Sequence, residues 1–135
     1  MSEKRVVARD HLEESLHYLM INVLVDSLEL QGFTVAADHI AGLRRQPAPI
    51  DDFLPDIEAK RGEEVHLIEV ETQSTLASPR SQHQLTLLAA QSGAHTYVAV
   101  PFDCIDKARM IRESLELRVG ILPCYPFVRY IGAIK

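Results

Sequence analysis

The chain contains no tryptophan and only two cysteines. It also lacks an uninterrupted apolar run long enough to cross a membrane. The two cysteines form no CxxC pair, and we interpret them as small hydrophobic side chains in a reducing compartment. The longest apolar stretch, residues 16–30, is interrupted by polar and charged side chains and does not predict a membrane span. The N-terminal residues are charged and lack the apolar core of a signal peptide. We therefore expect a cytoplasmic protein with no membrane partner.

Several catalytic motifs are also missing from the sequence. No G-x-G-x-x-G segment or P-loop is present to bind the phosphates of a nucleotide. The nucleophile elbow G-x-S-x-G and the zinc-binding pattern H-E-x-x-H are absent as well. The sequence therefore gives no support for a dinucleotide-dependent enzyme, an α/β-hydrolase or a zinc protease.

The composition is ordinary for one globular domain, which we place at residues 1–135. The net charge of -5 is unevenly distributed. Residues 1–78 hold 7 Lys/Arg and 15 Asp/Glu, a net of -8, whereas residues 79–135 hold 7 and 4, a net of +3. An acidic balance is not typical of nucleic-acid binders, but the second half carries cations that would either contact phosphate or remain solvated. These are Arg80, Lys107, Arg109, Arg112 and Arg118.

The spacing of apolar residues predicts an alternation of helices and strands. Helices are expected at residues 10–31, 79–92 and 103–117. Strands are expected at residues 33–37, 54–60, 65–72, 95–100, 119–122 and 127–131. This order predicts an α/β fold with a mixed central sheet flanked by helices. The sheet is expected to be antiparallel at its hairpin and parallel across the helical crossovers.

Three carboxylates are predicted to converge at this hairpin. If Arg61-Gly62 forms a two-residue turn, Asp56 lies opposite Leu67 and diagonal to Glu69, at a Cβ separation of roughly 7–8 Å. Because strand side chains alternate, Glu69 and Glu71 share one face. Oxygen ligands of this kind suit Mg²⁺ or Mn²⁺. The alternative is an exposed hairpin with acidic residues on its solvent side.

The pattern Pro55-Asp56, a thirteen-residue step to Glu69, and Ile68-Glu69-Val70-Glu71 resembles the PD-(D/E)xK nuclease superfamily. The nearest resemblance is to the small Holliday-junction-resolvase-like nucleases. It covers roughly residues 10–100 and includes the expected helix and strand order. The resemblance implies a restriction-endonuclease-like αβββαβ core and metal-dependent cleavage of phosphodiesters, in DNA rather than RNA. Because junction resolvases act as dimers, it also implies a homodimer.

The resemblance assigns roles to individual residues. Asp56 and Glu69 would ligate the metal, with the backbone carbonyl of Val70 as a further ligand. Gln84 would orient water or phosphate, with Gln82 as the second choice. The family's lysine is replaced here by Glu71, which would bind a second metal, accept a proton from water, or mark a site that has lost catalysis.

Glu13 is a further metal-ligand candidate on the predicted first helix. It lies within the apolar arc of that helix, where the family often has an acidic ligand. Asp10 and Glu13 also have the spacing of a capping box, and local chemistry favours this structural role. His17, one turn later, is interpreted as structural.

Two further interpretations remain beside the nuclease hypothesis. One is a catalytically inactive nuclease-fold domain that serves as a binding or assembly module. The missing lysine and the negative net charge favour it. The other is an unrelated α/β protein in which the motif arose by chance.

Overall fold

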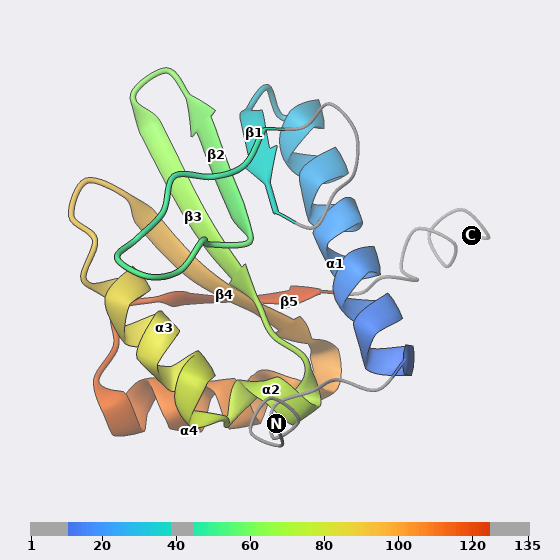
Figure 1. The fold of residues 1–135 in the computed structure, drawn as a ribbon, viewed down its shortest axis with the longest axis vertical. Helices are drawn as coiled ribbons and strands as arrows, with labels where there is room; N and C mark the ends of the chain where they lie inside the picture. The colour runs from blue at the N-terminus through green and yellow to red at the C-terminus, as the bar shows by residue number, and fades with distance from the viewer. Residues whose placement is uncertain (1–10, 39–44, 125–135) are drawn as a thin grey trace.

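The computed structural model describes residues 11–38 and 45–124, which form a five-stranded mixed sheet flanked by helices (Figure 1). The order begins helix, three strands, helix, strand, so the predicted α/β class and αβββαβ order are confirmed. The elements are α1 (His11–Leu30), β1 (Thr34–Ala37), β2 (Ile57–Arg61), β3 (Glu64–Val70), α2 (Gln73–Leu76), α3 (Pro79–Ala89), β4 (His95–Pro101), α4 (Ile105–Leu115) and β5 (Gly120–Cys124).

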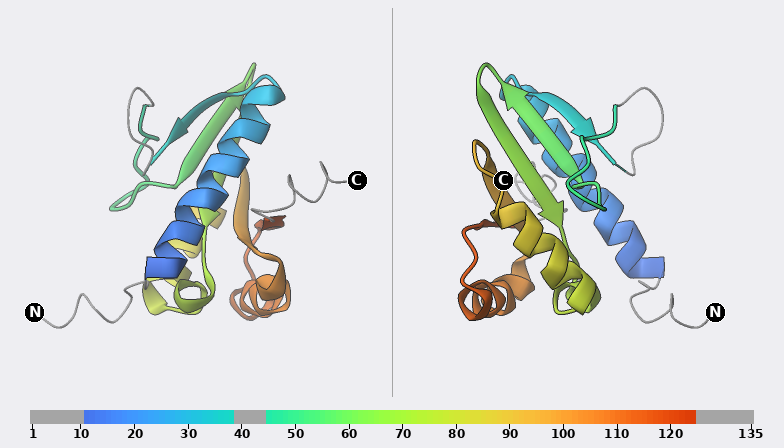
Figure 2. Two further views of the ribbon diagram at one scale, coloured as in Figure 1. Left: turned by 90° about the vertical axis from the view of Figure 1, so that its right-hand side faces the viewer. Right: turned by 60° about the vertical axis from the view of Figure 1, so that its left-hand side comes forward.

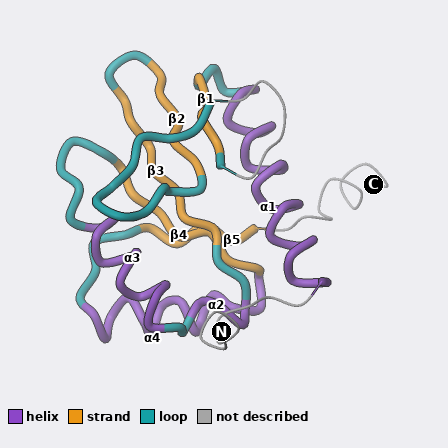
Figure 3. Tube along the Cα trace, viewed as in Figure 1, coloured by secondary structure: helices purple, strands orange, loops and turns teal. Residues whose placement is uncertain are grey.

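The sheet has the strand order β1-β2-β3-β4-β5. β1, β2 and β3 pair antiparallel, whereas β3, β4 and β5 pair parallel across the connections that contain α3 and α4 (Figure 3). The helices cover both faces: α1 packs on one, and α3 and α4 pack on the other (Figure 2). None of the helices within the described residues has the length and apolar character of a membrane span.

The alternation of side chains in β3 separates two hydrophobic cores. Ile68 and Val70 belong to the core beneath α1, whereas Val65 and Leu67 belong to the core beneath α3 and α4. This confirms the predicted assignment of alternate residues to opposite faces. Glu69 follows Leu67 on the α3 side of the sheet, at the end of the strand.

The hairpin turn lies one residue later than the sequence predicts. Gly62 and Glu63 are its central residues, because Arg61 pairs with Glu64. Gly62 has a φ of 61°, a conformation that glycine adopts without steric cost and that two-residue hairpins with glycine first require. The predicted pairing of residue 56 with residue 67 is therefore wrong by two positions.

This change of register brings Asp56 and Glu69 closer together than the sequence predicts. Ile57 pairs with Ile68, so Asp56, one residue earlier, lies directly across from Glu69 rather than diagonal to it. Because the shift is an even number of residues, every side chain keeps its predicted face.

Other boundaries also differ from the sequence expectation. β2 begins at Ile57 rather than residue 54, since Pro55 has no N–H to donate to a ladder. The short helix α2 was not expected, because four residues show no helical periodicity. The expected strand at 127–131 and the capping residue Asp10 lie outside the described residues.

His66, on the α1 side of β3, lies within a group of rings near the hairpin. Its ring centroid is 5.0 Å from that of Phe33, 4.8 Å from that of His95 and 5.7 Å from that of Tyr97. Its Nε2 is buried and has no hydrogen-bond partner among the described residues. Burial first, and then the nearby charge of His95, lower the pKa of His66 below its ordinary value.

We expect His66 to make folding sensitive to mild acid. Because its pKa is lowered in the folded state, the unfolded state binds the proton more readily, so stability present above about pH 6.5 is lost below it. Replacing His66 with Phe should reduce the fall in urea midpoint between pH 7.5 and pH 5.5. The matched control is His83→Gln, at an exposed position on α3. An unchanged pH dependence in His66→Phe would contradict this expectation.

Candidate functional site

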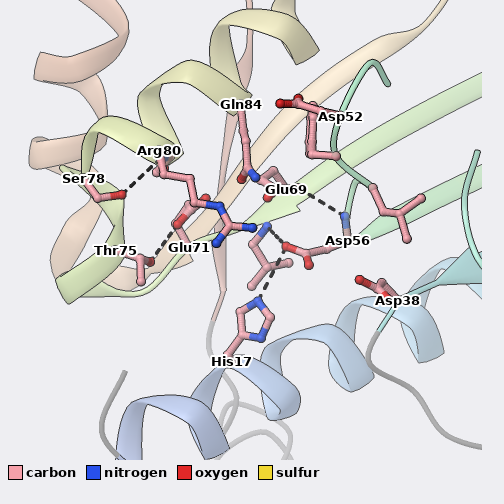
Figure 4. Close-up of a pocket in the computed structure, with 14 residues that line it drawn as sticks. His17, Asp38, Asp52, Asp56, Glu69, Glu71, Thr75, Ser78, Arg80 and Gln84 are labelled. Atoms are coloured by element: carbon pink, nitrogen blue, oxygen red, sulfur yellow. Dashed lines mark hydrogen bonds and ion pairs between the residues drawn. The ribbon is translucent and has the colours of Figure 1, made fainter. Parts of the chain in front are cut away.

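A pocket of about 380 Å³ lies where α1, the start of β2, the end of β3 and the first turns of α3 meet (Figure 4). The acidic residues that line it are Asp38, Asp52, Asp56, Glu69 and Glu71. Arg80 is the only arginine or lysine among its described lining residues, which also include His17 and Gln84. The pocket is therefore strongly acidic, with one guanidinium at its wall.

Two hydrogen bonds tie Asp56 to the end of β3 beside Glu69. The amide of Val70 donates to Asp56 Oδ2 at 2.7 Å, and the amide of Asp56 donates to Glu69 Oε1 at 3.2 Å. Both residues are buried, with exposed fractions of 5% and 6%. Buried carboxylates that accept bonds from backbone amides are fixed in orientation, because breaking such bonds leaves a donor unsatisfied.

The pairing of strands explains why Asp56 accepts this bond. The amide of Glu71 donates to Ala99 of β4, and successive amides of a strand alternate in direction, so the amide of Val70 points toward β2. β2 begins only at Ile57. The Asp56 carboxylate therefore takes the place of the missing backbone acceptor, and the end of the hairpin positions the side chain.

α1 contributes His17 to the pocket rather than Glu13. His17 is buried, and its Nε2 lies 3.6 Å from Asp56 Oδ2. Glu13 does not line the pocket. Its Oε1 accepts hydrogen bonds from the hydroxyls of Thr72 and Ser74, which ties the first turn of α1 to the start of α2.

Glu71 occupies the position at which the resembled family has lysine. It is 3% exposed, and Thr75 Oγ1 donates to its Oε1 at 2.7 Å. Thr75 also caps α2 together with Thr72. The unexpected helix α2 therefore presents a hydroxyl donor to the carboxylate, which stabilises a negative charge at this position.

The first turns of α3 supply the remaining polar groups. Ser78 caps the helix by accepting a bond from the amide of Ser81 at 3.1 Å, and Pro79 occupies the first turn. Arg80 and Gln84 line the pocket. Gln82 instead donates to the carbonyl of Ala77 and does not line it. The preferred glutamine, Gln84, is thus the one that reaches the pocket.

Sequence reasoning did not single out every polar residue of the pocket. The sequence predicts a structural role for His17 and does not single out Asp38 or Thr75. The sequence does show that His17 lies one helical turn after Glu13, on the same side of the predicted helix. No pattern in the sequence indicates Asp38, because its position depends on how β1 lies against β2.

The donor chemistry of the pocket suits a hard cation. Asp56 and Glu69 offer carboxylate oxygens, and Val70 lines the same pocket. Within residues 11–38 and 45–124, however, no three His, Cys, Asp or Glu side chains are arranged as a ready metal centre. A Mg²⁺ or Mn²⁺ ion would therefore use two carboxylates and complete its coordination with water and ligand oxygens, as magnesium commonly does.

Comparison with known proteins adds no assignment: no family model, curated protein or solved structure matches the chain. The residues of the pocket are therefore the basis on which a function is assigned.

We expect the Asp56 carboxylate to stabilise the fold as well as shape the pocket. Asp56→Ala leaves the Val70 amide without its acceptor and should lower the free energy of unfolding by about 1–3 kcal/mol. Asp56→Asn retains an acceptor oxygen and should cost less. Urea unfolding in EDTA measures both, with Glu113→Ala, at an exposed position on α4, as control. Wild-type stability in both variants would contradict a net stabilising role for the Asp56 carboxylate.

Proposed function

We propose that this chain is a metal-dependent phosphodiesterase domain of the PD-(D/E)xK nuclease type, which cleaves DNA with Mg²⁺ or Mn²⁺. One observation carries the proposal. Asp56 and Glu69 lie across from one another at the end of a β-hairpin, buried in an acidic pocket that also contains Glu71 and Gln84. Carboxylates gathered in this way are costly to fold without a cation, and buried like-charge groups are a feature of functional sites.

The metal ligands would be Asp56, Glu69 and the carbonyl of Val70. A bound divalent cation polarises a phosphate oxygen and lowers the pKa of a bound water. The bonds from the Val70 amide to Asp56 and from the Asp56 amide to Glu69 hold the two carboxylates in place before any ligand arrives. Such preorganisation reduces the cost of ordering side chains on binding.

The remaining polar residues would act on water and phosphate. Hydrolysis adds water across one P–O ester bond; the water loses a proton, and the leaving oxygen gains one. Glu71 is a proton acceptor in the position of the family's lysine, and Thr75 fixes its orientation. The Gln84 amide, which offers both donors and an acceptor, would orient water or a phosphate oxygen.

Because the junction resolvases that the chain resembles act as dimers, we propose that it acts as a homodimer on its substrate. We place it in the cytoplasm, because both cysteines are buried and free rather than joined in a disulfide.

A second candidate function is a non-catalytic binding or assembly module of the same fold. It is favoured by the bonds that the carboxylates already make. Asp56 and Glu69 accept from backbone amides, and Glu71 accepts from Thr75. In this function the acidic residues would brace β2, β3 and α2 without any cation.

A cleavage assay separates the two functions. Purified protein incubated with single-stranded, duplex and branched DNA and Mn²⁺ should cleave at least one substrate. Asp56→Asn and Glu69→Gln should reduce the rate on the order of 100-fold or more, since loss of a ligand costs at least as much as loss of its supporting contacts. The exposed Asp51→Asn is the control and should cleave as the wild type does.

Calorimetric titration with Mn²⁺ completes the test. Wild-type protein that neither cleaves these DNAs nor binds Mn²⁺ would exclude the phosphodiesterase and support the binding module. Circular dichroism of each variant confirms that a lost activity is not a lost fold.

A further inference from the structure

Arg80 is distinctive among the groups of the pocket because it is the single arginine or lysine among the described lining residues. It lies in the first turn of α3, and its side chain is exposed. In Figure 4 the guanidinium is directed into the pocket and lies, in that view, between Glu71 and Asp56. A guanidinium offers planar pairs of donors that match the oxygens of a phosphate.

Ser81, the next residue, provides an independent observation. It lines the same pocket and is 3% exposed, yet its Oγ has no hydrogen-bond partner among the described residues. Its backbone amide is already used by the Ser78 cap. A buried hydroxyl without a partner costs free energy, and a ligand oxygen at the pocket wall would supply the missing acceptor.

The helix adds a favourable field for an anion at the same place. α3 spans 11 residues and begins at Pro79, so the positive end of its dipole lies beside Arg80 and Ser81. No acidic residue occurs in its first turn. The guanidinium, the hydroxyl and the helix terminus therefore favour negative charge on one wall of an otherwise acidic pocket.

We infer that Arg80 and Ser81 form a binding subsite for a backbone phosphate of DNA, and that Arg80 supplies the cationic group absent at Glu71. This inference rests on the proposed function and names its phosphate-binding residues. The remaining walls of the pocket carry five carboxylates, which repel a phosphodiester unless a cation offsets them. Phosphate binding at Arg80 therefore depends on bound metal, and the two ligands are positively coupled.

Arg80 has opposite effects on the two ligands, and this provides the test. Its charge attracts phosphate but repels a metal held by Asp56 and Glu69. Arg80→Gln should weaken binding of a fluorescent DNA about 10-fold, measured by anisotropy in Ca²⁺ with the DNA checked for integrity. The slope of log affinity against log salt concentration should also fall by about one, the value for one lost phosphate contact. Mn²⁺ binding, measured by calorimetry without DNA, should become about 3-fold tighter.

Two further variants control for charge and position. Arg80→Lys retains the positive charge and should keep most of the DNA affinity. Arg109→Gln removes an exposed arginine of α4, which pairs with Asp106 and does not line the pocket. It should change neither DNA affinity nor Mn²⁺ affinity.

Ser81→Ala is expected to raise thermal stability and to weaken DNA binding. Removing a buried hydroxyl without a partner should raise the melting temperature by about 3 °C, because the desolvation cost disappears and Ala suits a helix. The same variant should bind DNA about 3-fold more weakly. Unchanged DNA affinity together with unchanged stability would remove Ser81 from the subsite.

The outcomes separate this inference from the proposed function. If the wild type binds Mn²⁺ and cleaves DNA but Arg80→Gln does both equally well, the subsite is overturned and the phosphodiesterase stands. If Arg80→Gln weakens Mn²⁺ and DNA binding together, Arg80 has a structural role and the subsite is again overturned. Wild-type protein that neither binds Mn²⁺ nor cleaves DNA would instead overturn the proposed function itself.

Discussion

The candidate site depends on one pair of hydrogen bonds, from the Val70 amide to Asp56 and from the Asp56 amide to Glu69. These bonds form where the backbone ladder between β2 and β3 ends. Each carboxylate there accepts a hydrogen bond from a backbone amide, as a carbonyl of the neighbouring strand does within the ladder. The hairpin turn at Gly62 sets the register that places Asp56 across from Glu69. The same atoms that end the hairpin therefore bring the two acidic side chains together.

The placement of these carboxylates opposes stability on electrostatic grounds. Asp56, Glu69 and Glu71 are all buried in one pocket, where like charges are more costly than in water. Amide and hydroxyl donors offset part of that cost. The same bonds would also serve a purely structural role, which is the second candidate function. Conflicts of this kind are expected at functional sites.

Much of the fold was predictable from short-range patterns. Period-two alternation assigned Ile68 and Val70 to one core and Leu67 to the other, and the spacing of apolar residues predicted α1, α3 and α4. The exact register was not predictable, because it depends on which two residues form the turn. The orientations of His17 and Arg80 also lay beyond the sequence, since they depend on how α1 and α3 approach the sheet from opposite sides.

The alternation of side chains in the hairpin strands limits which insertions the hairpin can accept. A single residue inserted between Ile57 and the turn, or between the turn and Val70, would exchange the two faces of that strand and could bury an acidic side chain beneath α1. A pair of residues would restore the faces and only lengthen the hairpin. In any lineage that retains this pocket, length changes inside these two strands should accumulate in twos, whereas the solvent-exposed turn tolerates changes of either parity.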